Sequence, residues 1–388
     1  MSPLKKNKIL LLCMILNLAL LTGCWDNMSI DRRAFVLGLG IDKFIFDEAK
    51  DDPSLNNDKT KYRVAFSFPN IAKFAGEQGL SDEPKFVMIS SGPTFSNTYK
   101  GLGGRLNKSP YFGHIKSIIF GKELLKDKVL FKEVLDTLQR NSDFSRSIPI
   151  VAIDGLATEA IQIIPEGNPL VSIYINQLFE SNKNETMRFQ EKDLGELLQN
   201  FQEDKMAMIP KLSIGEKDIK IAGAAIIKDY ELKGWLDEQQ TRGALWLRKK
   251  NQRLEISAPY EDFHVAYHVS NAKSEMKFMN KDNELSCHIT IQAEGNLDEF
   301  ILDRNILNVE EIKKVEEAIE KSIKEEVENS LKTLQEKYQA DVVGIGKELE
   351  RQKPKEWEKV KDHWEEVFET LPISIDVQIN IRRIGQSK

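Results

Sequence analysis

Cysteine is scarce in this chain, which has three in 388 residues. Cys13 lies inside an apolar N-terminal run and Cys24 directly follows that run. If the run is removed and Cys24 is modified, as argued below, Cys287 has no cysteine left to pair with. Internal disulfides are therefore excluded, and the hydrophobic core must stabilise the fold, as this chain length allows.

Positive charge is also limited. Lysine and arginine number 55 against 61 aspartates and glutamates, which gives a formal net charge of -6 and a pI of about 5.7. Removal of Lys5, Lys6 and Lys8 with the N-terminal run makes the mature chain more acidic still. An acidic chain binds nucleic acid poorly, so we expect no nucleic-acid partner.

Long apolar runs are rare, and the only one extends from Ile9 to Leu21 with a single polar residue, Asn17. Its length of about thirteen residues is well below the roughly twenty that a membrane-spanning helix needs. Three lysines precede it and small residues follow it, which is typical of a secretory signal. We therefore predict that residues 1–23 are a signal peptide.

The end of this signal has the pattern of a bacterial lipobox, Leu21-Thr22-Gly23-Cys24. In that pattern the Cys24 thiol receives a diacylglycerol, and the residue becomes an N-acylated amino terminus. Two or more acyl chains anchor a protein durably, whereas a single chain binds reversibly. The basic residues before the run stay in the cytoplasm, so the mature chain lies outside it. An uncleaved short anchor and a signal that is cut elsewhere remain as alternatives.

Alternating apolar residues predict strands in the first part of the mature chain. The segment 33–42 reads as an interior strand because both of its faces are apolar or small, and 62–68 alternates cleanly. Further strands are expected at 86–93, 111–121 and 147–155, with helices at 94–106, at 122–140 and onward to about residue 202. We therefore expect a mixed α/β region over 24–204, formed by one lobe or two.

The second part, 219–388, has the pattern of an α+β domain that begins after a polar boundary at 211–218. Strands are expected at 221–229, 252–258, 263–269, 273–279, 285–293 and 372–381, with a long helix at 309–338 and another at 354–370. The predicted fold class is α+β or mixed α/β. It comprises about three small domains with mostly antiparallel sheets, packed helices and a long helix near the C-terminus.

Candidate metal and nucleophile residues have patterns that favour structural roles. His264 and His268 fall on a predicted strand, where four residues span about 13 Å, too far for two nitrogens to share one ion. Cys287 shares a strand face with Leu285 and Ile289, while His288 points to the other face. We therefore expect no metal site, no Cys–His pair, no catalytic residue and no cofactor.

Three further segments are weak motifs. The glycine-rich stretch 101–109 lacks the Gly-Lys-Ser/Thr ending of a phosphate loop, and 38–42 lacks the spacing of a dinucleotide-binding turn. The basic cluster 247–253 could contact anionic headgroups or a partner, but it is typical of a solvated hairpin turn.

Several segments together resemble one family, the C subunits of spore germinant receptors, which are lipoproteins of endospore-forming bacteria. The N-terminal segments are LTGCWDNMSIDRRAFVLGLGID, GHIKSIIFGKELL and LQRNSDFSRSIPIVAIDGLATEAI. The C-terminal segments are IAGAAIIKDYELKGWLDEQQTRGALWL, ADVVGIGKELERQKPKEWEKVKDHWEEVF and VQINIRRIG. The resemblance spans nearly the whole mature chain in order. One departure is at Val343–Gly346, where we expect an aromatic residue before a glycine.

The resemblance implies a lipid-anchored protein on the outer face of the spore inner membrane, attached through Cys24. It also implies a complex with two integral-membrane partners, the A and B subunits, which responds to nutrients and triggers germination. The family is not known for an enzymatic activity. Two alternatives are a lipid-anchored solute-binding protein, which usually has two similar lobes, and a cell-wall hydrolase. The sequence shows neither a two-lobe repeat nor a catalytic carboxylate pair.

Overall fold

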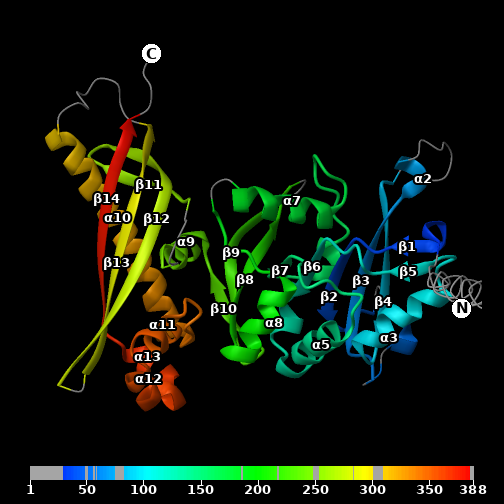
Figure 1. Ribbon diagram of the computed structural model, residues 1–388. Helices are drawn as coiled ribbons and strands as arrows, with labels where there is room; N and C mark the ends of the chain where they lie inside the picture. The colour runs from blue at the N-terminus through cyan, green and yellow to red at the C-terminus, as the bar shows by residue number, and fades with distance from the viewer. Residues whose placement is uncertain are drawn as a thin grey trace, which may run out of the picture.

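A computed structural model describes residues 29–48, 51–55, 57, 59–74, 83–184, 187–215, 218–247, 253–282, 284–299 and 309–384. These residues form an eight-stranded sheet, a four-stranded sheet and a small two-stranded sheet, all with helices packed around them (Figure 1). The N-terminal elements lie at one end of the molecule and the four-stranded sheet lies at the other.

The eight-stranded sheet has the order β10-β9-β8-β7-β6-β2-β3-β4. Its strands are β2 (Gly38–Lys43), β3 (Tyr62–Pro69), β4 (Lys85–Gly92), β6 (Ser117–Gly121), β7 (Ile150–Ile153), β8 (Met206–Ile214), β9 (Ile219–Lys228) and β10 (Glu231–Leu236). The neighbours from β8 to β2 are parallel and the pairs at either end are antiparallel. The strands β6 and β7 are buried along their whole length, as expected for parallel strands with helices on both faces.

Helices cover both faces of this sheet. One face carries α3 (Phe95–Lys100), α4 (Lys122–Leu125), α5 (Lys128–Arg140) and α8 (Leu194–Glu203), and the other carries α6 (Ala157–Ala160) and α7 (Val171–Asn184). The helix α5 buries one apolar stripe, and Asp127 caps its start by accepting a hydrogen bond from the Leu130 amide at 3.1 Å. Asp193 and Glu196 form a capping box at the start of α8.

The strand β9 contributes to three hydrophobic cores, and its start, with Ile219 and Ile221, packs in the core under α6 and α7. Ala225 and Ile227 face the core under α5 and α8, whereas Ala224 and Ile226 face the core of the C-terminal part. Since β8 pairs with β9, one continuous sheet joins the two parts of the chain. The domain limits predicted above, 24–204 and 219–388, stay a prediction.

The four-stranded sheet has the order β11-β12-β13-β14. Its strands are β11 (Glu255–Tyr260), β12 (Phe263–Lys281), β13 (Glu284–Glu299) and β14 (Ile373–Ile384), and the helices α9 (Glu238–Trp246) and α10 (Val309–Lys332) pack against it. The expectation of two separate strands at 263–269 and 273–279 is wrong. They form the single strand β12. The polar residues between the two expected strands lie at a β-bulge, where the register shifts between Val269 and Asn271 and the strand continues.

The helix α10 and the helical segment 354–370 are each less continuous than their sequence pattern predicts. The stripe 309–338 is α-helical only as far as Lys332 and continues as a π-helical turn, η4 (Thr333–Tyr338), which ends at Gln339 with φ +49°. The helix expected at 354–370 is divided by a 3₁₀ turn. The last helical elements are α11 (Ile345–Gln352), α12 (Pro354–Val360), η5 (Lys361–His363) and α13 (Trp364–Thr370).

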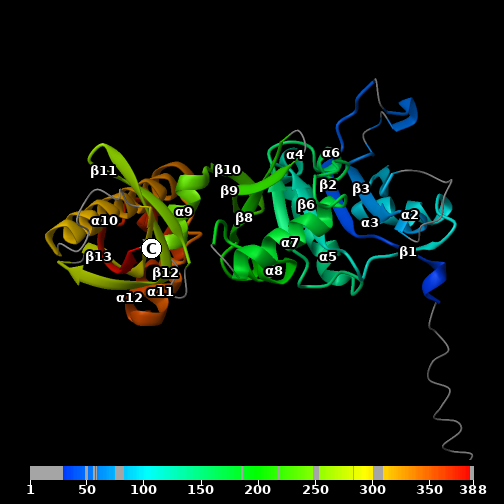
Figure 2. The same cartoon turned by 90° about the horizontal axis from the view of Figure 1, so that it is seen from above.

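Small elements build the N-terminal end of the molecule. They are η1 (Ile30–Arg32), β1 (Arg33–Phe35), η2 (Pro53–Leu55), α2 (Ile71–Phe74), η3 (Gly101–Gly104) and β5 (Ser109–Tyr111). The strands β1 and β5 pair in parallel, so the strands expected at 33–42 and 111–121 are each divided in two. Seen from above, β1, α2 and α3 gather at one end (Figure 2). The mixed α+β class, the antiparallel sheets with packed helices and the long C-terminal helix are confirmed.

Candidate functional site

The lipobox residues Leu21, Thr22, Gly23 and Cys24 lie outside the described residues, which begin at Ser29. An extended chain advances at most about 3.5 Å per residue, so the five steps from Cys24 to Ser29 span no more than about 18 Å. Within the described ranges, no helix is both long and apolar enough to cross a bilayer. The attachment chemistry at Cys24 therefore stays a prediction from sequence.

The two histidines lie on β12, as predicted. His264 pairs with Pro259 and His268 with Glu255, which places them four residues apart along one strand. Over the described part of the chain, no three His, Cys, Asp or Glu side chains are grouped to hold a metal ion. The structure thus gives these histidines a place on the outer face of a sheet.

Cys287 is buried in the core, with 1% of its surface exposed. Burial raises the pKa of its thiol to about 12, and the charges of Asp341 and Glu348 add to the shift. The thiol is therefore protonated at neutral pH, and a protonated thiol is a poor nucleophile. His288 points to the opposite face, where its Nδ1 lies 2.8 Å from Ser374 Oγ. The predicted separation of the two side chains is confirmed.

The glycine motifs serve the packing of helices on the sheet. A Cβ at Gly40 would lie 2.4 Å from the Ala157 carbonyl oxygen, and one at Gly38 would lie 2.7 Å from Ser172 Cβ. Glycine therefore lets α6 and α7 approach β2 closely. The stretch from Gly101 forms the 3₁₀ turn η3, and most of the basic cluster 247–253 lies outside the described residues.

Asp42 is a buried carboxylate that the sequence analysis did not single out. Its side-chain oxygens accept hydrogen bonds from the amides of Ala157 at 2.9 Å and Thr158 at 2.8 Å, where α6 begins. Burial raises its pKa, and these two bonds oppose the shift by stabilising the charged form. No local sequence pattern marks this role, because the amide of Ala157 lies 115 residues further along the chain. Asp42 acts as a structural cap.

Asp341 has a similar role at α11. It accepts hydrogen bonds from the amides of Gly344, Ile345 and Gly346 at 2.9, 2.9 and 2.6 Å, and from Trp364 Nε1 at 3.1 Å. Gly344 has φ +83°, which glycine adopts readily. Burial raises the pKa of Asp341 against the effect of these four bonds. The unusual Val343–Gly346 segment is thus a carboxylate-capped helix start.

A cavity of about 680 Å³ lies where α8 and β8 meet the C-terminal helices. Its charged and aromatic lining residues are Glu203, Asp204, Asp341, Lys347, Glu350, Trp357, Lys361, Asp362, His363, Trp364, Glu365 and Glu366. Carboxylate and indole walls suit a positively charged group. Lys347 already supplies one, because its Nζ lies 2.7 Å from Glu203 and 2.6 Å from Asp204. The protein's own cation therefore already pairs with two of the carboxylates of the lining.

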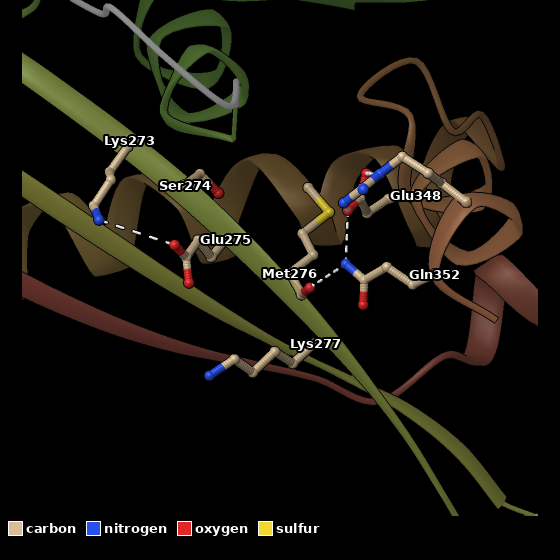
Figure 3. A pocket seen from close by; sticks show the side chains of 8 residues that line it. Lys273, Ser274, Glu275, Met276, Lys277, Glu348 and Gln352 are labelled. Carbon is tan, nitrogen blue, oxygen red and sulfur yellow. Dashed lines mark hydrogen bonds and ion pairs between the residues drawn. The ribbon is translucent and has the colours of Figure 1, made fainter.

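A second cavity, of about 400 Å³, lies between the late part of β12 and α11 (Figure 3). Gln352 Nε2 donates to the Met276 carbonyl oxygen and to Glu348 Oε1, both at 2.6 Å, and Glu348 also pairs with Arg351. Ser274 lines the cavity, and its buried hydroxyl has no hydrogen-bond partner among the described residues. No base among the described residues is therefore hydrogen-bonded to this hydroxyl.

Two protein-family profiles match this chain and together cover almost its full length. The profile described as "Spore germination protein N-terminal domain" matches residues 26–214, and "Spore germination B3/ GerAC like, C-terminal" matches residues 222–385. The two matches meet at the β8–β9 turn, within the continuous sheet.

Similar curated proteins and a solved structure agree with this assignment. Spore germination protein YndF of Bacillus subtilis (strain 168) is 23% identical over 100% of this chain and 99% of its own length. Spore germination protein A3 of the same organism is 25% identical over 97% and 98%. The crystal structure of the GerBC protein aligns with a TM-score of 0.58 and 20% identity, covering 84% of this chain and 95% of that one, and it supports the fold. The chain belongs to the GerAC-like family of spore germination proteins.

Proposed function

We propose that this protein is the lipid-anchored, non-enzymatic C subunit of a nutrient germinant receptor in the spore inner membrane. The observation that carries the proposal is the match of both family profiles, in order, over residues 26–214 and 222–385. Its relatives are named as spore germination proteins, which supports a role in germination for this chain as well.

The lipid anchor accounts for how such a subunit stays at the membrane. Cys24 ends a lipobox, and the apolar run before it is too short to span a bilayer. Tethering confines the folded body to a thin layer above the membrane, which raises its effective concentration near integral-membrane A and B subunits. The body then acts by contact with these partners, and the nutrient response belongs to the complex.

The non-enzymatic character is supported by the chemistry of the buried groups. Cys287 is a protonated core thiol, and Asp42 and Asp341 have their oxygens engaged by helix-start amides. Among the described residues, neither the 680 Å³ cavity nor the 400 Å³ cavity provides a nucleophile that is hydrogen-bonded to a base. Incubating the protein with peptidoglycan tests the cell-wall hydrolase alternative, and released fragments would favour that alternative.

A solute-binding protein is the second candidate function, and the 680 Å³ cavity is the observation that favours it. Proteins of that type usually close two similar lobes around a ligand, whereas here the two main sheets have eight and four strands and different strand orders. Titration calorimetry with amino acids and sugars separates the two candidates. Tight binding by this protein alone would favour the solute-binding function.

The main test replaces Cys24 with alanine in the spore-forming host. We expect the variant to leave the membrane fraction, to fail to co-purify with the integral-membrane subunits and to slow nutrient-triggered germination. A Cys287→Ser variant is the matched control, because it removes the other cysteine of the mature chain without touching the anchor. Normal membrane retention and germination of the Cys24→Ala variant would refute the proposal.

A further inference from the structure

We propose that the N-terminal end of the folded body docks on anionic phospholipid headgroups through a basic surface. This basic end consists of Arg32, Arg33, Lys100, Arg105 and Lys108, which come from η1, β1, α3, η3 and the approach to β5. The inference rests on the proposed function, because the lipid at Cys24 is what brings this end to the bilayer.

The first support is a local reversal of charge. The chain as a whole is acidic, with 61 acidic and 55 basic residues, yet the segment 84–122 contains no aspartate or glutamate. Its cations are Lys85, Lys100, Arg105, Lys108, Lys116 and Lys122. Lys85 is buried and Lys122 pairs with Asp154 at 2.7 Å, so these two do not contribute to a free surface. Lys100, Arg105 and Lys108 are exposed.

The second support is that the fold brings these cations together. The parallel pairing of β1 with β5 sets Arg33 opposite Ser109, which places Arg32 and Arg33 beside Lys108. The Arg33 guanidinium lies over the Tyr111 ring, 4.4 Å from its centroid. Arg105 Nη1 donates to the Ile89 carbonyl oxygen at 2.7 Å, which fixes η3 against the edge strand β4. Through the described part of the chain, no carboxylate forms an ion pair with any of these five cations.

The third support is distance from the anchor. The five steps between Cys24 and Ser29 reach no more than about 18 Å, and Arg32 follows only three residues later. Figure 2 shows β1 and α3 at the same end of the molecule. Ile30, in η1, is 74% exposed, which leaves an apolar side chain between the anchor and the basic end. The tether therefore delivers this end, and not the distant four-stranded sheet, to the headgroup layer.

Docking of the basic end would fix the orientation of the folded body relative to the membrane. Lysines and arginines close to an anionic surface each strengthen its attraction by about fivefold in affinity, and salt weakens the effect beyond a Debye length of about 10 Å. A lipid anchor plus a basic patch gives durable binding with a fixed orientation. The acidic remainder of the chain is repelled by the same surface, which favours an upright position with the four-stranded sheet away from the membrane.

The test uses the full-length lipidated protein reconstituted into vesicles of phosphatidylcholine, with or without phosphatidylglycerol. Hydrogen exchange is followed by mass spectrometry at low and high salt. We expect amides of residues 97–109 to exchange at least about fivefold more slowly on the anionic vesicles at low salt. The variant Arg32→Glu/Lys100→Glu/Lys108→Glu should lose this protection. The control variant Lys273→Glu/Lys277→Glu/Lys281→Glu, on exposed positions of β12, should keep it.

Each outcome has a defined meaning. Equal protection on neutral and anionic vesicles would overturn the inference. So would protection that appears only when the integral-membrane subunits are reconstituted as well, because the basic end would then bind protein. Vesicle flotation and the mass of the Cys24 peptide are recorded in parallel. A protein that fails to float refutes the lipid anchor itself, whereas a floating protein without protection refutes only the docking surface.

Discussion

Arg242 of α9 and Glu326 of α10 form a two-contact ion pair at the junction between the two sheets. Arg242 Nε lies 2.9 Å from Glu326 Oε2, and its Nη2 contacts Oε1. The Glu326 side chain is only 5% exposed. The hydrogen bond to Glu326 raises the pKa of Arg242, so the guanidinium stays charged. The helix α9 also contacts β9, so this ion pair links α10 through α9 to the eight-stranded sheet.

Removing one partner of this pair should be costly. We expect Arg242→Met to lower the free energy of unfolding by about 3 kcal/mol, because it leaves the Glu326 charge buried without a partner. The double variant Arg242→Met/Glu326→Leu should recover most of the loss, since replacing a buried pair with apolar groups is often nearly neutral. Urea denaturation measures both. A double variant less stable than the single one would contradict this account.

The crossing of α9 and α10 depends on Gly243. A Cβ there would lie 2.3 Å from the Glu326 carbonyl oxygen and 2.8 Å from Ser330 Cβ. We expect Gly243→Ala to lower the free energy of unfolding by about 2 kcal/mol or more. The added methyl group would clash with backbone atoms of α10, and these can move away only if the two helices separate. Gly103→Ala is the control, since a Cβ at that position meets nothing within 4 Å. Similar melting temperatures for the two variants would disprove the close crossing.

Lys85 should make stability depend on pH in the alkaline range. Its ammonium donates to the carbonyl oxygens of Ile161, at 2.9 Å, and Ile163 at the end of α6. Burial lowers its pKa from 10.5 to about 8. Between these values the unfolded chain binds a proton that the folded chain has lost, so the contribution of Lys85 to stability rises with pH. Below pH 8 Lys85 is charged in the folded chain as well, so the cost of burying its ammonium lowers the free energy of unfolding in full.

The comparison of wild type with Lys85→Met isolates this effect from the other groups that titrate in the same range. The difference in unfolding free energy should change by up to about 3 kcal/mol between pH 8 and 10.5, in favour of the wild type at high pH. Denaturant melts at a series of pH values measure it. Parallel curves for the two proteins would show that Lys85 keeps an ordinary pKa.

Asp341, which lies just before α11, should be important for the stability of the C-terminal helices. Asp341→Ala leaves the three amides at the start of α11 and Trp364 Nε1 without their acceptor, which we expect to cost about 3 kcal/mol. Asp341→Asn should cost less because one acceptor oxygen remains. Tryptophan fluorescence during unfolding reports the change. Asp362→Ala, an exposed residue of the same cavity, is the control and should stay within about 0.5 kcal/mol of wild type.

The local elements follow from sequence patterns wherever one periodicity is strong. The alternation from Ile373 to Ile381 and the apolar stripe that starts at Val309 both became the expected strand and helix. The predicted burial of Cys287 is also confirmed, because its strand face is apolar throughout. In each case a single buried face decides the conformation, and the residues of that face are close in the sequence.

Pairings between distant segments could not be predicted in the same way. The strand β14 follows three short helices yet pairs in parallel with β13, setting Ile375 opposite Ile289. The edge of β14 is then closed by α10, whose Glu320 accepts a hydrogen bond from the Ile379 amide at 3.0 Å. Burial raises the pKa of Glu320, and no local pattern marks this residue among the many glutamates of that helix. Whether a glutamate accepts hydrogen bonds from the exposed amides of an edge strand depends on which helix packs beside that edge.

The sequence by itself predicted the signal and the lipobox at Cys24, and it determined the acid-free segment 84–122, because these depend only on the order of charges and apolar groups along the chain. The tertiary structure decided that β8, β9 and β10 join both parts of the chain in one sheet, and that the β1–β5 pairing brings the segments that carry Arg33 and Lys108 side by side. These relationships bring together segments tens of residues apart. They are set by the packing of whole faces, which one-dimensional periodicity does not encode.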